Sequence, residues 1–302
     1  MAFSKKIAEN EAVLQEKLPI QKSFDIISRH ILIGGRDALY VSIDGLSKDD
    51  TILRIFQTIQ GAAPCEDLSS LQHFLQSQIG YLESEITDDW DLAVRMILSG
   101  ELLLLIDGFD SGILLDTRTY PSRSPEEPDL EKVTRGARDG LVETIVFNTA
   151  LIRRRIRDPQ LVYEIYTVGN SSKTDVVIGY MDSLADPDLL DHLRDALKKL
   201  DTDALLMGEK TLEELLIKKR WYNPFPQAKF TERPDVAAAH LLEGHVIVLV
   251  DNSPSAMLFP ATMFHFTQHS EDYYQNPLVG TYTRWIRFIA MLSCLFFAPA
   301  WL

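Results

Sequence analysis

Six arginines in one short stretch are the residues of this chain whose types and spacing most suggest binding chemistry. The segments TRGARDG and LIRRRIRDP place them at Arg135, Arg138, Arg153, Arg154, Arg155 and Arg157. Guanidinium groups bind phosphates and carboxylates through paired hydrogen bonds. One interpretation of the cluster is therefore a face that binds phosphate, another anion or a partner subunit.

A structural interpretation of the same arginines stays open, and the pattern favours it. The spacing predicts a helix from about Gly140 to Arg157, ended by Asp158-Pro159. One face of this helix is apolar and carries Leu141, Ile145, Thr149, Ile152 and Ile156. The arginines then occupy its carboxyl end, where the helix dipole stabilises cations. Salt bridges to the acidic surroundings would account for most of them, and contacts to a partner subunit for the rest.

Catalytic and metal-binding patterns are weak. The acid pairs in SPEEPDLE and TDDWD are typical of solvated surface or helix caps. His265 and His269 have the spacing of two metal ligands on a helix, but no third ligand is evident nearby. The chain has no GxxxxGK[ST], GxGxxG or GxSxG motif. We therefore predict that the protein is not an enzyme and that it uses no metal and no cofactor.

The net charge of the chain indicates which classes of partner it is not expected to bind, and the cysteines and the amino terminus indicate its compartment. A formal net charge of −14 argues against a nucleic-acid-binding protein, because affinity for phosphate is built from lysine and arginine. Cys65 and Cys294 are far apart in the chain, so a structural disulfide is not expected. The first residues are charged and amphipathic and do not resemble a signal peptide, which predicts that the body of the protein stays in the cytoplasm.

Short apolar runs predict the strands. ALYVSIDG (38–45), ELLLLIDG (101–108) and HVIVLVDN (245–252) each end at an aspartate followed by a turn residue. GILLD and SAMLF follow the last two runs and predict hairpins, and LVYEIYTVG pairs in the same way with KTDVVIGYMD. Helices are predicted between them, with Ser47, Asp186 and Thr211 as amino-terminal caps and another start at Pro234.

The order of these elements predicts a mixed α/β fold built from two small subdomains with antiparallel hairpins. We expect an amino-terminal amphipathic segment, a first subdomain, a proline-rich linker, a second subdomain and a final apolar helix. Their predicted ranges are 1–22, 23–118, 119–134, 135–276 and 277–302. The connector NPFPQAKFTERPD carries Phe225 and Phe230, which we regard as candidate subunit contacts.

The carboxyl end is apolar on every side. The fifteen residues after Arg287 carry no charge. At about 1.5 Å per residue they are too short for a bilayer core of about 30 Å. A helix that starts near Leu278 is long enough but includes Arg284, Trp285 and Arg287, which are residue types found at membrane interfaces. We predict the start of a transmembrane helix, with a buried or amphipathic helix as the alternative.

Several segments resemble a known family. YPSRSPEEPDLEKVTRGARDGLVETIVFNTALIRRRIRDP, ERPDVAAAHLLEGHVIVLVDNSPSAMLFPATMFHF and SEDYY follow one another as in the A subunits of bacterial spore germination receptors, the GerA family. SFDIISRHILIGGRDALYVSIDG, NPFPQAKFTERPD and VDNSPSAM look most similar to its stage V sporulation protein AF branch. The resemblance runs from about Ser23 to the last residue.

The resemblance implies a two-subdomain region on the cytoplasmic side of the spore inner membrane, which is the core side. It also implies assembly with other germination-receptor subunits, as a homo- or hetero-oligomer in the membrane, and a part in signal transmission or ion release. The family's later membrane helices do not follow in this sequence, so conduction by this chain alone is not expected. The alternative hypothesis is a soluble protein that binds a small molecule in a cleft between the subdomains.

Overall fold

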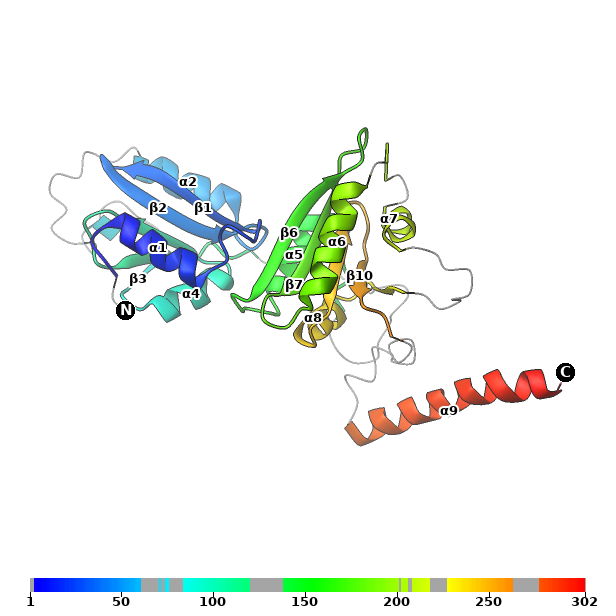
Figure 1. Ribbon diagram of the computed structural model, residues 1–302. Coiled ribbons are helices and arrows are strands. Elements are labelled where there is room, and N and C mark those ends of the chain that lie inside the picture. The colour runs from blue at the N-terminus through cyan, green and yellow to red at the C-terminus, as the bar shows by residue number, and fades with distance from the viewer. Residues whose placement is uncertain are drawn as a thin grey trace.

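The computed structural model places two five-stranded sheets side by side, each covered by helices, and a long helix at the carboxyl end (Figure 1). The structure describes residues 3–60, 71, 74–75, 84–119, 138–200, 202–205, 208–217, 227–262 and 277–301. Within these ranges every strand pairing inside the two sheets is antiparallel.

The first subdomain is built on a sheet in the order β1-β2-β4-β5-β3. Its strands are β1 (Ile26–Ile33), β2 (Arg36–Ile43), β3 (Ser84–Thr87), β4 (Leu102–Ile106) and β5 (Gly112–Leu115). Helices α1 (Ile7–Lys17) and α4 (Trp90–Leu98) pack on one face, and α2 (Asp49–Gln60) packs on the other. β4 is buried along its whole length because both faces of the sheet are covered.

The second subdomain is built on a sheet in the order β6-β7-β9-β10-β8. Its strands are β6 (Leu161–Val168), β7 (Thr174–Met181), β8 (Lys229–Thr231), β9 (Val246–Val250) and β10 (Ala256–Phe259). Helices α6 (Pro187–Lys199) and α7 (Glu209–Leu216) cover one face. Helices α5 (Ile145–Arg153) and α8 (Pro234–Leu242) cover the other.

The two subdomains repeat one topology. Each sheet starts with a long hairpin at one edge, places a second hairpin next to it, and adds a short strand beyond that hairpin. In both, the helix before the second hairpin ends in a turn built on a glycine with positive φ, Gly100 in the first and Gly244 in the second. The chain therefore folds as two structural repeats.

Most predicted elements are confirmed. The hairpins β4-β5, β6-β7 and β9-β10 pair as expected. Asp186 caps α6, since its carboxylate accepts a hydrogen bond from the Asp188 amide, and α8 starts at Pro234. The short strands β3 and β8 are not among the predicted strands. β3 has the sequence SEIT and β8 has only three residues, so neither shows a clear apolar run.

The expected boundaries of three helices are wrong. α5 covers Ile145–Arg153 and not Gly140–Arg157, because the Asn148 side chain binds both the amide and the carbonyl of Val142 and holds residues before the helix in a loop. α7 starts at Glu209, with Gly208 in place of Thr211 at the cap position. α2 starts at Asp49, two residues after the expected cap.

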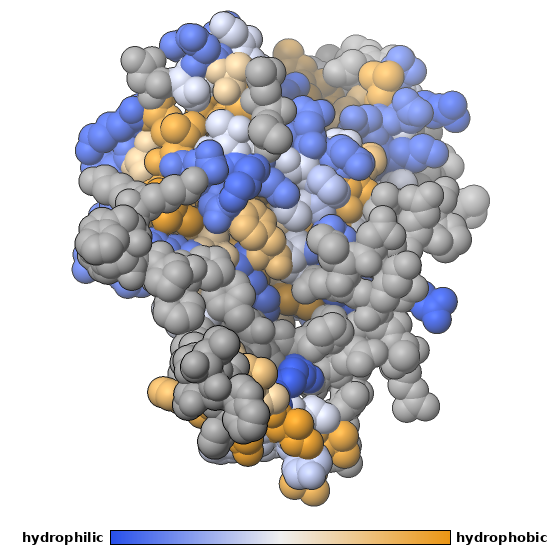
Figure 2. Space-filling view, turned by 90° about the vertical axis from the view of Figure 1, so that its right-hand side faces the viewer, coloured by the Kyte–Doolittle hydropathy of each residue, from blue (hydrophilic) through white to orange (hydrophobic). Residues whose placement is uncertain are grey.

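The carboxyl-terminal helix α9 covers Pro277–Trp301. Its apolar side chains face outward at the bottom of the molecule (Figure 2), and Leu278, Trp285 and Phe296 are 82%, 61% and 65% exposed. None of the helices in the described part of the chain has the length and apolar character that crossing a membrane requires. The expected start of a transmembrane helix is thus not confirmed by the structure.

Candidate functional site at the junction of the two subdomains

The segment Ser23–Asp25 joins the two subdomains through hydrogen bonds to the main chain of β6. It enters β1 of the first sheet and also lies against β6, the edge strand of the second. The Phe24 amide donates to the Tyr163 carbonyl at 3.0 Å. The Tyr163 amide donates to the Ser23 hydroxyl oxygen at 2.9 Å. Part of an otherwise open sheet edge is therefore covered by the neighbouring subdomain.

A buried ion pair crosses the same junction. Arg153, the last residue of α5, donates from Nε and Nη2 to the two carboxylate oxygens of Asp25, at 2.9 and 3.0 Å. Arg153 Nη1 donates to the Leu161 carbonyl at 2.9 Å, and the Ser23 hydroxyl donates to Asp25 at 2.6 Å. The two side chains are 0% and 2% exposed. Both charges are thus paired and hydrogen-bonded, as buried charges must be.

Tyr163 packs against this ion pair. Its ring lies 5.0 Å from the guanidinium carbon of Arg153, within the range of a cation–π contact. Its hydroxyl donates to the Thr149 carbonyl at 3.3 Å. Burial raises the pKa of the Tyr163 phenol far above its usual range, with a smaller opposing effect of Arg153. Tyr163 is therefore a neutral, structural part of the junction and not an acid or base.

A close backbone approach forms a second contact between the subdomains. Gly45 follows β2 in the first subdomain and has φ +75°. A Cβ at this position would lie 3.0 Å from the Ala150 Cβ and 3.1 Å from the Val146 carbonyl oxygen, both in α5. Only glycine fits this position without displacing the helix. α5 therefore packs on the second sheet and against the first subdomain at once.

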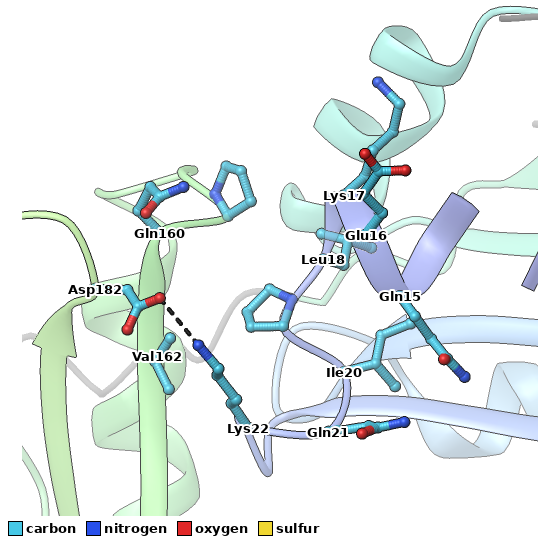
Figure 3. A pocket seen from close by; sticks show the side chains of 12 residues that line it. Gln15, Glu16, Lys17, Leu18, Ile20, Gln21, Lys22, Gln160, Val162 and Asp182 are labelled. Atoms are coloured by element: carbon cyan, nitrogen blue, oxygen red, sulfur yellow. Dashed lines mark hydrogen bonds and ion pairs between the residues drawn. The ribbon is translucent and has the colours of Figure 1, made fainter. Parts of the chain in front are cut away.

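A groove of about 340 Å³ lies beside the junction (Figure 3). One wall is the chain from Gln15 to Lys22, and the other includes Gln160, Val162 and Asp182. Lys22 and Asp182 face each other across it, with Nζ 3.1 Å from the carboxylate oxygen. Both side chains are substantially exposed, at 60% and 44%, so this ion pair contributes little to stability. The groove can admit a small polar molecule.

The arginine cluster divides into residues with different surroundings. Arg138, Arg154 and Arg157 are exposed, and Arg155 is half-buried and pairs with Asp139 at 2.6 Å. Arg153 is wholly buried, so its expected contact with a partner subunit is replaced by an intramolecular role at the junction. Arg135 lies outside the described residues.

The remaining predicted site residues lie on different parts of the molecule. Phe230 is the middle residue of the edge strand β8 and is 36% exposed, which leaves a subunit contact as a prediction. Phe225, His265 and His269 lie outside the described residues. Arg284, Trp285 and Arg287 lie on α9, where a place at a membrane interface stays a prediction.

One polar cluster was not found from the sequence. Glu164 on β6 accepts hydrogen bonds from Tyr180, Tyr166 and Arg194, at 2.6, 2.7 and 2.6 Å. Burial alone would raise the pKa of Glu164, but these hydrogen bonds and the Arg194 charge lower it to about 2. A carboxylate with so many donors is a poor general base. The alternation of polar residues along LVYEIYTV was the available signal.

Comparisons with known proteins fit this architecture. Residues 13–302 match the family model described as Bacillus/Clostridium GerA spore germination protein. The chain is 41% identical over 295 residues to stage V sporulation protein AF of Bacillus subtilis, and 30% identical over 302 residues to spore germination protein KA of the same organism. These alignments cover 97% and 99% of this chain but only 60% and 55% of the two relatives.

A solved structure has the same two-subdomain fold. It is the crystal structure of the N-terminal domain of the A subunit of the Bacillus megaterium spore germinant receptor GerK3. The TM-score is 0.64 at 26% sequence identity, and the match covers 87% of this chain and 98% of that one. The resemblance expected from the sequence is confirmed, and the relatives are named as germination or sporulation proteins, not as enzymes. This chain therefore belongs to the GerA family of spore germination proteins.

Proposed function

We propose that this chain is the amino-terminal, non-enzymatic part of a spore germination protein, which assembles with partner subunits and passes a signal between them. The observation that carries this proposal is the junction, where the Arg153–Asp25 ion pair and the hydrogen bonds of Ser23 and Phe24 with Tyr163 connect the two subdomains. Two bodies connected in this way move together, so a force on one subdomain reaches the other.

The proposed location is the spore inner membrane, with the two subdomains on the core side. α9 supports this, because it exposes large apolar side chains along a helix of 25 residues and carries Arg284, Trp285 and Arg287 in its amino-terminal half. Aromatic and basic residues of this kind anchor helices at the membrane–water boundary. One of the relatives is named a membrane protein of Bacillus subtilis, at 35% identity over 277 residues.

The proposed contact with partner subunits is the exposed part of the arginine cluster. Arg138, Arg154 and Arg157 are exposed and cationic on a chain of net charge −14, so they can bind an acidic partner that the rest of the surface repels. Exposed charges at the rim of an interface act mainly on the rate of association and on specificity. Phe230 on the edge strand β8 is a second candidate contact.

Charge reversal tests this proposal. We expect the variant R138E/R154E/R157E to fold normally but to lose copurification of partner subunits from spores and to slow germination. K173E/K198E/K199E is the matched control, because it makes the same change in net charge at exposed lysines of the second subdomain. If the arginine variant assembles and germinates like the control, these arginines are not the subunit contact.

The groove beside the junction supports a second candidate function, the binding of a small molecule between the subdomains. Its volume of about 340 Å³ and its polar wall suit an amino acid or a sugar. A ligand that binds only the folded protein raises its melting temperature. Thermal-shift screening of the full chain against amino acids and sugars tests this, with K22E as the variant that should lose the response. The absence of any stabilising compound would leave assembly as the favoured function.

A further inference from the structure

The turn that ends α8 brings two histidines and a glutamate together. The Gly244 amide donates to the Leu241 carbonyl and the His245 amide to the His240 carbonyl, both at 3.0 Å. This pair of hydrogen bonds is a Schellman motif, in which the side chain two residues past the helix end contacts the last turn. Gly244 has φ +90°, as the motif requires. The sequence HLLEGH therefore places the His245 ring against the His240 ring.

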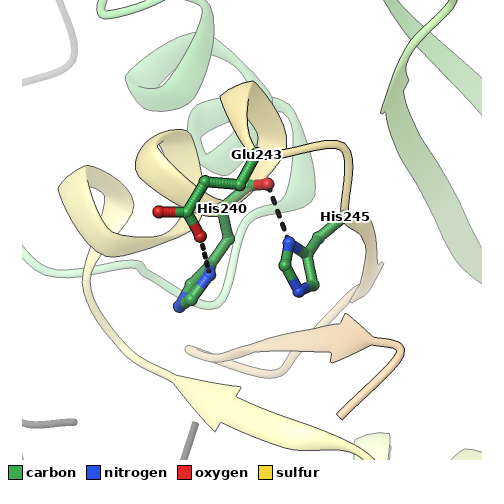
Figure 4. A group of neighbouring side chains, drawn as sticks. All are labelled: His240, Glu243 and His245. Atoms are coloured by element: carbon green, nitrogen blue, oxygen red, sulfur yellow. Dashed lines mark hydrogen bonds and ion pairs between the residues drawn. The ribbon is translucent and has the colours of Figure 1, made fainter. Parts of the chain in front are cut away.

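Side-chain donor atoms of the three residues lie near one another, and His245 Nδ1 also lies 3.2 Å from the His240 carbonyl oxygen (Figure 4). His240 Nδ1 lies 3.2 Å from the Glu243 carboxylate oxygen, and the two imidazole centroids are 5.0 Å apart. One ligand atom from each of the three residues lies within 4.8 Å of the others. Two ligands about 2.0–2.2 Å from a tetrahedral Zn²⁺ are about 3.2–3.6 Å apart, so the His240–Glu243 distance already fits an ion.

The same turn occurs in the first subdomain without histidines, so the Schellman motif does not require two histidines and a glutamate. α4 ends in the same motif, with the Gly100 amide on the Ile97 carbonyl at 2.9 Å and the Glu101 amide on the Met96 carbonyl at 3.0 Å. The positions of His240, Glu243 and His245 are occupied there by Met96, Ser99 and Glu101. The two histidines and the glutamate are therefore an addition of the second repeat to a shared scaffold.

We propose that His240, Glu243 and His245 form a divalent metal site of the zinc type. Two imidazoles and one carboxylate are a usual ligand set for Zn²⁺, with the fourth position left to water or another ligand. The ion would lie at the carboxyl end of α8, where the helix dipole stabilises positive charge. This site goes beyond the proposed function in assembly, and it opposes the expectation from the sequence that the chain has no metal site.

Two side chains hold the His240 ring in place. Lys229 Nζ lies 3.3 Å from His240 Nε2, and the Glu243 carboxylate oxygen lies 3.2 Å from His240 Nδ1. Nδ1 is therefore the ring nitrogen of His240 that faces Glu243 and the proposed site.

Calorimetric titration of the full chain with ZnCl₂ tests the site. We expect one ion per chain, and tetrahedral d–d absorption when Co²⁺ replaces Zn²⁺. H245A and E243S should weaken the affinity by more than about tenfold, since losing even an outer-shell partner costs about 10–100-fold.

The controls separate this site from general binding by histidines and from misfolding. E243S introduces the serine found at the same point of the first repeat, so the metal-free protein should still fold, with a cooperative melting transition. H192A removes an exposed histidine of α6 and should bind Zn²⁺ as the unmodified chain does. Failure of the unmodified chain to bind one ion overturns the proposal, as do equal affinities of H245A, E243S and H192A.

Discussion

Arg153 and Asp25 are 128 residues apart in the chain, yet they form a paired ion contact at 2.9 and 3.0 Å. Arg153 ends the helix α5, and Asp25 stands one residue before the first strand of the first sheet. Both side chains are almost completely buried. The pair also binds the Leu161 carbonyl and the Ser23 hydroxyl. A single buried arginine thus connects α5, β6 and the entry to β1.

Removal of Arg153 should strongly destabilise the fold. R153M keeps much of the side-chain volume but leaves the Asp25 carboxylate buried without its partner. We expect the free energy of unfolding to fall by about 3–5 kcal/mol. Urea unfolding, followed by circular dichroism, measures this. R157M at a neighbouring exposed arginine is the control and should change stability by about 0.5 kcal/mol or less. Similar losses in both variants would contradict the role of the junction.

A side chain at Gly45 should disturb the contact between the subdomains. Gly45 and Gly35 have similar positive φ values, +75° and +81°, so alanine is strained by about 1–2 kcal/mol at either position. Only at Gly45 does a Cβ also meet Ala150 and Val146 of α5. We expect G45A to lower the melting temperature clearly more than G35A. Equal effects of the two substitutions would show that the close approach to α5 is not maintained in solution.

Acid should weaken the second subdomain through Glu164. Its pKa in the folded protein, about 2, lies below the ordinary value of 4.5. A group with a lowered folded-state pKa stabilises the protein fully above about pH 4.5, and this contribution is lost as the pH falls toward about 2. Melting temperatures measured across this range should fall more steeply for the unmodified chain than for E164Q. E143Q, at an exposed glutamate, should retain the steep profile.

Membrane binding should depend on α9. The exposed Trp285, Ile289 and Phe296 supply apolar area, and Arg284 and Arg287 favour anionic lipid. We expect the full chain to sediment with phosphatidylglycerol vesicles. A chain that lacks residues 277–302 should stay in the supernatant, and so should I289E/F296E, which keeps the helix length. Sedimentation of all three proteins alike would mean that another surface binds the lipid.

Much of the fold could be predicted from near neighbours in the sequence. The apolar runs around Leu104 and Val248 gave the central strands, since a strand buried on both faces needs no polar alternation. Asp186 and Pro187 gave the start of α6, because a cap is a contact between adjacent residues. The short strand β8 was missed because its three residues show no apolar run and pair with a distant strand, β10.

The candidate site was only partly predictable. The sequence indicated that the arginine-rich stretch is important, and it offered both a structural and a partner-binding interpretation. It did not show that Arg153 alone would be buried while Arg154 and Arg157 stay exposed. Three consecutive arginines look alike in sequence, and their separation depends on which side of α5 faces the first subdomain. The glycine in HLLEGH is typical of a helix end. That Met96–Glu101 forms the same turn in the first subdomain becomes evident only when the two sheets are compared.

The sequence by itself determined the local helices and strands, the negative net charge, the apolar carboxyl end and the family. Caps, strand periodicity and family motifs each depend on residues that are close together in the chain. Only the tertiary structure decided that the two subdomains share one topology and that Asp25 neutralises Arg153. A buried charge is stable only with its partner, and the partner stands 128 residues away. Contacts at such separation depend on how the sheets and helices pack, which no short segment specifies.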